Sequence, residues 1–152
     1  MKTTILNTAA LLIALFFATP VKAENPAHVR QLLETNICPG CDLVGADLSG
    51  AHAIGADLRN ADLAGANLEN ANLEGADLTG ANLEGADLTN AFLNTATLTD
   101  TNLQGVDLTD ANLSFSNLTN ADLTAADLSD TNLIGADLND AEMPAEMLGR
   151  VQ

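Results

Sequence analysis

Residues 51–88 read AHAIGADLRNADLAGANLENANLEGADLTGANLEGADL, in which the motif Ala-(Asp/Asn)-Leu-x-x returns every five residues. The period runs without insertion or deletion from Cys41 to Ala145, so 105 residues form 21 blocks. The central position is Leu in 19 blocks, and the exceptions are Ala53 and Met143. Two positions earlier, 16 blocks have Ala, and the others have the fairly small residues Cys41, Thr101, Val106, Ser116 and Thr131. Large and small apolar residues therefore alternate two positions apart.

A period of five fits neither an α-helix nor a straight β-strand. In a helix, five residues advance about 500°, so successive leucines would spiral over every face. In a strand, the side-chain period is two, so successive leucines would point to opposite faces. The pattern is consistent with a chain that turns a corner in every block, with each Ala and Leu pointing to a common axis. Four corners per revolution predict a square solenoid.

Turn-forming residues recur where such a backbone would bend. Nine of the 11 glycines lie two places after the central position, and four Asn and four Asp share that position. Gly lacks Cβ, and Asn and Asp form local hydrogen bonds, so these residues tolerate turn conformations best. The predicted corner therefore carries a turn residue in 17 of 21 blocks.

Residues 51–88 and residues 121–138, which read ADLTAADLSDTNLIGADL, closely resemble the pentapeptide repeat family. The resemblance covers about two thirds of the chain. It implies an all-β solenoid, a right-handed quadrilateral β-helix of about five coils with coils one strand spacing apart, on the order of 25 Å long. The resemblance is specific for the fold and weak for function, because solenoids offer surfaces rather than a shared chemistry.

The N-terminal segment does not repeat. Residues 1–23 are typical of a cleaved export signal: Lys2 supplies positive charge, residues 11–18 form an apolar run, and residues 21–23 form a small-residue cleavage site. A retained membrane anchor is the alternative, but the apolar run is short for a bilayer. We expect the mature chain to begin at Glu24.

Both ends of the solenoid are predicted to be capped. Residues 24–40 suit a capping helix and a cysteine-bearing seam, because Asn25 fits the N-cap and Pro26 the first turn. Val29, Leu32 and Leu33 are expected to form one apolar stripe on this helix. The solenoid spans residues 41–145, and residues 146–152 are predicted to form a short C-terminal cap. Terminal coils need such covers because they expose core and unpaired backbone.

The chain is strongly acidic, with a formal net charge of −16 at pH 7. All 21 acidic residues lie beyond residue 23, whereas only Arg30, Arg59 and Arg150 of the five basic residues do. Such a surface repels nucleic acid and anionic membranes and favours basic proteins or cations. A solvated, self-repelling surface without a specific partner is the plainer alternative.

The two cysteines form the run Cys38-Pro39-Gly40-Cys41 at the seam between the predicted cap and the first coil. Both fall on inward phases of the repeat, and in an exported protein we predict a disulfide that staples the cap to the solenoid. A redox-active pair is an alternative, because C-x-x-C is also the thioredoxin-like spacing. A metal site is a third reading, for which only His28 is a nearby further ligand.

No catalytic constellation is evident. The histidines are His28 and His52, and the serines beyond residue 23 are Ser49, Ser114, Ser116 and Ser129. A general acid needs a desolvated environment to raise its pKa, which ridge positions on a convex rod lack. The sequence also lacks a Gly-rich phosphate loop and an EF-hand spacing. We predict neither an enzymatic activity nor a catalytic, metal or cofactor site.

Residues twenty apart should lie on the same face in adjacent coils, and two of the four faces differ sharply. The acidic face is centred on Leu48, Leu68, Leu88, Leu108 and Leu128, and it carries Asp47, Glu69, Asp87, Asp107, Asp110, Asp127 and Asp130. Asp87, Asp107 and Asp127 should stack about 4.8 Å apart. Like charges so close are unfavourable unless a cation offsets them, so a divalent ion or a basic partner is one reading, and screening by counterions is the other.

The neutral face is centred on Ala53, Leu73, Leu93, Leu113 and Leu133, and its only formal charge is Glu74. It carries Ile54, Phe92, Phe115 and Ile134 at outward positions. These side chains are interpreted as a contact surface, because several apolar residues share one uncharged face. The alternative is that the rings lie flat over their neighbours.

The resemblance extends to several functions. The family includes quinolone-resistance proteins whose acidic rods resemble DNA and bind gyrase, and DNA mimicry is kept as a minor alternative, since an export signal would separate this chain from gyrase. The chain is more similar to small exported cyanobacterial members, which implies the thylakoid lumen or the periplasm.

We therefore predict a non-catalytic structural or protein-binding module with no cofactor, whose partner is an unidentified protein. Nucleic acid binding and membrane insertion after signal cleavage are not expected, and the protein should be monomeric or weakly self-associating. Low-affinity divalent-cation binding through the Asp ladders is the main alternative.

Overall fold

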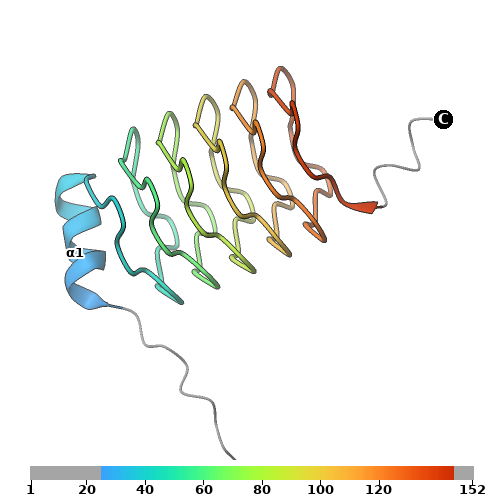
Figure 1. Ribbon diagram of the computed structural model, residues 1–152. Helices are drawn as coiled ribbons and strands as arrows, with labels where there is room; N and C mark the ends of the chain where they lie inside the picture. Colours follow the sequence, from blue (N-terminus) through green and yellow to red (C-terminus); the bar gives the residue numbers. More distant parts are fainter. Residues whose placement is uncertain (1–24, 146–152) are drawn as a thin grey trace, which may run out of the picture.

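The computed structural model describes residues 25–145. The predicted export signal (1–23) and C-terminal cap (146–152) lie outside the described residues. Within them, a single helix, α1 (Pro26–Thr35), is followed by a chain that winds in stacked coils (Figure 1). α1 lies across the N-terminal end of the stack, and no helix in residues 25–145 is both long and apolar enough to cross a membrane.

The coils are held in a fixed register of twenty residues. Parallel β-bridges join residues twenty apart, from the Ile37–Asp57 pair to the Asp122–Glu142 pair. One coil therefore consumes four blocks, as the square solenoid requires. Each side of a coil is so short that it contributes an isolated bridge rather than a continuous strand.

Backbone hydrogen bonds run from each coil to both neighbours. The N–H of Leu63 donates to the carbonyl of Asn82 in the next coil at 2.7 Å, and the N–H of Asp62 donates to Cys41 in the preceding coil at 2.8 Å. The N–H of Ala66 closes the corner by donating to Leu63 at 3.0 Å. This scheme gives the backbone polar groups partners even though the interior is apolar.

The core is a stack of leucine and alanine along the axis. Every central residue from Leu43 to Leu123 is at most 2% exposed, including Ala53. Burial decreases in the last described coil, where Leu128, Leu133, Leu138 and Met143 are only partly buried. These residues are less covered because no further coil follows them within residues 25–145. The predicted inward phase of Ala and Leu is confirmed.

The predicted corners adopt a left-handed backbone conformation. From Gly45 to Asp140, every residue two places after a central position has φ between 55° and 72°. Thr95, Phe115 and Ala125 hold this conformation as well, although they are not turn-forming residues. The periodic hydrogen bonding of the coils therefore imposes the corner geometry even where the local side chain does not favour it.

α1 begins with the predicted capping residues and ends at a left-handed Asn36. Asn25 is the N-cap and its Oδ1 accepts from the N–H of Ala27 at 3.1 Å, whereas Asn36 ends the helix with φ 56°. Leu32 is 1% exposed and belongs to the core, and Val29 packs against it. The predicted apolar stripe is wrong at Leu33, which is 51% exposed. Leu33 follows Leu32 directly and so lies about 100° around the helix.

Candidate functional site

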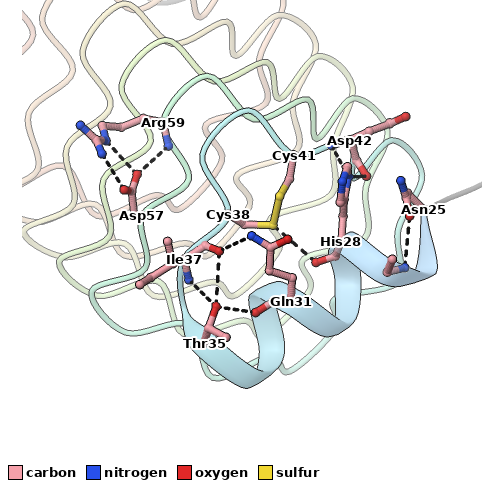
Figure 2. The surroundings of a disulfide bond; sticks show 11 residues. Asn25, His28, Gln31, Thr35, Ile37, Cys38, Cys41, Asp42, Asp57 and Arg59 are labelled. Atoms are coloured by element: carbon pink, nitrogen blue, oxygen red, sulfur yellow. Dashed lines mark hydrogen bonds and ion pairs between the residues drawn. A yellow bond between two sulfur atoms is a disulfide. The ribbon is translucent and has the colours of Figure 1, made fainter.

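Cys38 and Cys41 are joined by a disulfide with a Cα–Cα distance of 5.3 Å. Both residues are buried, and the Sγ atom of Cys38 lies 3.4 Å from the carbonyl oxygen of His28 on α1 (Figure 2). The N–H of Cys38 already pairs with Asp57, so Cys38 belongs to the first coil. The disulfide therefore cross-links two residues of that coil beneath α1, and it does not join the helix covalently to the solenoid as a staple would.

Side-chain hydrogen bonds attach α1 to the first coil. The Nδ1 atom of His28 accepts from the backbone N–H of Asp42 at 2.9 Å, and the Nε2 group of Gln31 donates to the carbonyl of Ile37 at 2.8 Å (Figure 2). Within residues 25–145, no group of three or more His, Cys, Asp or Glu side chains could hold a metal ion.

The acidic face has the register that the sequence predicts. Asp107 forms β-bridges with both Asp87 and Asp127, so these three carboxylates belong to adjacent coils on one line. Asn67 interrupts the line between Asp47 and Asp87. The remaining carboxylates of the face, those of Glu69, Asp110 and Asp130, are exposed. The structure thus brings three of the seven predicted acidic residues into one unbroken ladder.

The three ladder carboxylates and Asp47 also have a structural role within their own blocks. The Oδ1 atoms of Asp47, Asp87, Asp107 and Asp127 accept hydrogen bonds from the backbone N–H two residues ahead, at 2.9–3.1 Å. Asp and Asn form such turns readily, which explains why the second position is Asp or Asn in 17 of the 21 blocks. The hydroxyl and then the N–H of Ser129 lower the pKa of Asp127, and Ser49 lowers the pKa of Asp47 in the same way.

A third face contains an ion pair that the sequence reasoning missed. Arg59 donates from Nε and Nη2 to Asp57 at 2.8 and 2.6 Å, and its Nε lies 3.8 Å from a carboxylate oxygen of Asp77 in the next coil. The hydrogen bond with Arg59 lowers the pKa of Asp57. The twenty-residue register places Asp57 beside Asp77 and could have revealed this group. A guanidinium across two stacked carboxylates shows how a basic side chain engages such a ladder.

The four apolar side chains predicted on the neutral face all point outward. Their exposed fractions are 53% for Ile54, 48% for Phe92, 67% for Phe115 and 71% for Ile134. They do not form one continuous patch, since Ile54 lies in the coil next to α1, where the Nδ2 group of Asn36 donates to its carbonyl at 3.2 Å. Phe115 and Ile134 are direct neighbours, because the N–H of Phe115 donates to the carbonyl of Ile134 at 2.9 Å.

Further exposed apolar side chains lie at the N-terminal end. Leu33 and Ile37 are 51% and 56% exposed. Ile37 forms a β-bridge with Asp57, which follows Ile54 by three residues in the next coil. The sequence reasoning missed both, because Leu33 was assigned to the buried stripe and Ile37 precedes the repeat. The pentad register extended back to Ile37 would have placed it outward.

The polar groups between the apolar side chains are uncharged amides that bond to one another. The Nδ2 group of Asn132 donates to Oδ1 of Asn112 at 3.2 Å. The Oδ1 atom of Asn132 accepts from the backbone N–H of Ile134 at 3.1 Å, and the Oδ1 atom of Asn112 accepts from the backbone N–H of Ser114 at 3.1 Å. Because these amides already have partners, the neutral face offers apolar contact with little competing polarity.

The pentapeptide repeats family matches residues 41–80, 76–114 and 107–143, in eight copies of the repeat. This chain is a pentapeptide repeat protein. The family assignment confirms the prediction from the five-residue period, and members of this family fold as right-handed quadrilateral β-helices. The comparison with curated proteins gave no match.

Solved structures of other pentapeptide repeat proteins are similar to this one. QnrB1, a plasmid-mediated fluoroquinolone resistance protein, has a TM-score of 0.63 at 23% identity over 69% of this chain and 54% of its own. HetL, from the cyanobacterium Nostoc sp. strain PCC 7120, is involved in heterocyst differentiation regulation. It has a TM-score of 0.51 at 33% identity, over 70% of this chain and 61% of its own. A pentapeptide repeat protein of the Arabidopsis thaliana thylakoid lumen has a TM-score of 0.47 at 34% identity, over 67% of this chain and 64% of its own.

These similarities establish the fold and leave the partner undetermined. The chain spans between 54% and 64% of the length of the three proteins. The likeness to QnrB1 shows the architecture alone at its level of identity. The family is one of structural and binding repeats, and no catalytic family is indicated.

Proposed function

We propose that this pentapeptide repeat protein is a non-catalytic protein-binding module of an exported compartment, the thylakoid lumen or the periplasm. The observation that carries the proposal is the exposure of Phe92, Phe115 and Ile134 on the face whose only formal charge is Glu74. A few anchor side chains, often aromatic, supply most of the binding energy at protein interfaces. Several of them on one uncharged face of an acidic rod favour recognition of a protein surface.

The compartment is supported by the sequence pattern of residues 1–23 and by the cysteine pair. A positively charged start, an apolar run and a small-residue site are typical of an export signal. Disulfides persist in oxidising compartments, and Cys38 and Cys41 are paired. We therefore expect the mature protein to begin at Glu24 and to be recovered outside the cytoplasm.

A binding role fits the carboxylates better than a catalytic role does. Asp47 and Asp127 are exposed, and their pKa values are lowered by hydrogen bonds from Ser49 and Ser129. A general acid requires the opposite shift, which burial in an apolar site would produce. The engaged Oδ1 atoms also make the acidic face a weaker candidate for specific cation coordination than for steering a basic protein.

Crosslinking in the intact exported compartment tests the proposal. The wild-type protein should yield discrete adducts with another protein, and a variant with Phe92→Ser and Phe115→Ser should lose them while remaining folded. A Glu69→Gln variant, altered on the acidic face, is the matched control and should keep them. Identical adducts from wild type and the double variant would refute the neutral face as the binding surface, and cytoplasmic recovery of the mature protein would refute the compartment.

A further inference from the structure

Phe115 occupies a corner that most other coils give to Gly, Asn or Asp. Its φ is 59°, in the left-handed region that a bulky L residue rarely adopts. In the same line of corners, Thr95 lies one coil before it and Gly135 one coil after it. An L side chain in this conformation is unfavourable, so the corner geometry does not explain the choice of phenylalanine.

The Phe115 ring rests on the backbone of Gly135. A Cβ atom built on Gly135 would lie 2.6 Å from Cδ1 and 2.7 Å from Cε1 of the ring, so only glycine leaves room for it there. The ring nevertheless remains 67% exposed, and the adjacent Ile134 is 71% exposed. These two are the most exposed large apolar side chains of residues 25–145. The ring therefore lies against the Gly135 backbone and stays mostly exposed.

Exposed carboxylates border this pair on both sides. Asp130 lies at the corner before the neutral face, twenty residues after Asp110 at the corresponding corner of the preceding coil. Asp137 and Asp140 lie on the face that follows. Phe115 and Ile134 therefore stand between two acidic borders, with the bonded amides of Asn112 and Asn132 beside them.

We propose that Phe115 and Ile134 form the anchor point for a positively charged protein segment that carries apolar side chains. The anchor would contact the apolar side chains while the flanking carboxylates pair with Lys or Arg. A second copy of this chain would oppose acid to acid, and nucleic acid and anionic membranes would be repelled. Arg59, which spans Asp57 and Asp77, makes the same kind of contact within the chain. This inference rests on the proposed function and specifies its partner chemistry.

Peptide binding measured by calorimetry at about 0.15 M salt tests the anchor. The probe is a synthetic amphipathic helix of leucine and lysine, compared with a glycine–lysine peptide of equal charge and a leucine–glutamate peptide. The first should bind most tightly and the last should not bind. Phe115→Asn should lower the affinity for the leucine–lysine peptide roughly tenfold and leave the affinity for the glycine–lysine peptide unchanged. Ile54→Asn, a comparably exposed position far along the rod, is the control and should change neither.

Thermal unfolding supplies a readout that separates a binding role from a structural one. Asn suits the left-handed corner, so Phe115→Asn should raise the Tm by about 2–5 °C if the ring serves contact. A lowered Tm would show that the ring stabilises the fold and would overturn the anchor. Equal affinity of wild type and Phe115→Asn for the leucine–lysine peptide would also overturn the anchor. The proposed function would be unaffected by that result if crosslinking still depends on the neutral face. Binding of neither lysine peptide would overturn the partner chemistry.

Discussion

The Nδ1 atom of His28 on α1 accepts a hydrogen bond from the backbone N–H of Asp42 in the first coil, at 2.9 Å. Together with the buried Leu32 and the Gln31 bond to Ile37, this bond attaches the helix to the end of the solenoid. Terminal units of a repeat protein open locally rather than with the whole rod. The contacts of α1 should therefore control the stability of the first coil more than that of the middle.

Replacing His28 with Ala should expose the first coil to local opening. The N–H of Asp42 would lose its partner, at a cost of about 1–2 kcal/mol, and its amide hydrogen exchange should accelerate roughly 5- to 30-fold. His28→Asn is the matched variant, because its Oδ1 replaces Nδ1 as acceptor, and it should retain most of the protection. Equal protection of Asp42 in the Ala variant and in wild type would show that the bond does not hold the helix.

The buried disulfide predicts a link between reduction and helix docking. In non-reducing conditions the mass of the protein should be lower by two hydrogens than that of the reduced chain, because Cys38 and Cys41 are paired. Both lie beneath α1, so a dithiol should reduce them only when the helix undocks. Leu32→Ala, which removes a buried side chain at a cost of about 2–5 kcal/mol, should accelerate reduction strongly.

Leu33→Ala is the control for that experiment, because Leu33 is on the same helix and half exposed. It should leave the reduction rate close to that of wild type. If the disulfide is reduced at the same rate in the Leu32→Ala and Leu33→Ala variants, it is accessible to the dithiol without movement of α1.

The sequence predicted the solenoid, the inward phase and the corners because all three follow from one period. With Leu and Ala fixed to the axis, the position of every other residue in the block is determined, as the outward Ile54 and Phe92 show. The period could not predict the details of α1, which lies outside the repeat. Leu33 therefore seemed equivalent to Leu32, although the helix turns it away from the core.

The candidate site was predictable as a face and not as a set of contacts. The register gives the coil and the side of Phe115 and Ile134, and it predicts the Asp87–Asp107–Asp127 ladder. It does not give the direction in which a side chain leans, so the ring of Phe115 over Gly135 could not be anticipated. Nor does it show that the Asp Oδ1 atoms bond to the backbone two residues ahead, which gives the carboxylates a structural role.

The hydrogen bonds to Asp127 predict an acid-dependent contribution to stability. The pKa of this carboxyl lies below its ordinary value of 3.8, first because of the Ser129 hydroxyl. A lowered folded pKa means that this stabilisation is fully present above the ordinary value and is lost as the pH falls through the lowered value. Ser129→Ala should raise the pKa of Asp127 toward 3.8, measured by carboxyl carbon NMR titration.

Ser49→Ala is the matched control for Asp127, since Ser49 bonds to Asp47 in a distant coil of the acidic face. It should raise the pKa of Asp47 and leave that of Asp127 unchanged. A titration of Asp127 that is the same in wild type and Ser129→Ala would rule out the hydroxyl as the cause.

Gly135 should be intolerant of a side chain for two separable reasons. Its φ is 72°, which an L residue rarely adopts, and a Cβ atom there would lie 2.6 Å from the Phe115 ring. Gly105 has φ 61° and no atom within 4 Å of a built Cβ, so it has only the first reason. We expect Gly105→Ala to destabilise the protein by about 1 kcal/mol and Gly135→Ala by about 1–3 kcal/mol, measured by denaturant unfolding.

A double-mutant cycle isolates the contact between the ring and Gly135. In a Phe115→Asn background the ring is gone, so Gly135→Ala should cost only about as much as Gly105→Ala does. The free energies should therefore be non-additive for the pair Phe115 and Gly135, and additive for Phe115→Asn combined with Gly105→Ala. Additivity in both pairs would mean that the ring moves aside at no cost. Gly135 would then not determine the position of the Phe115 ring.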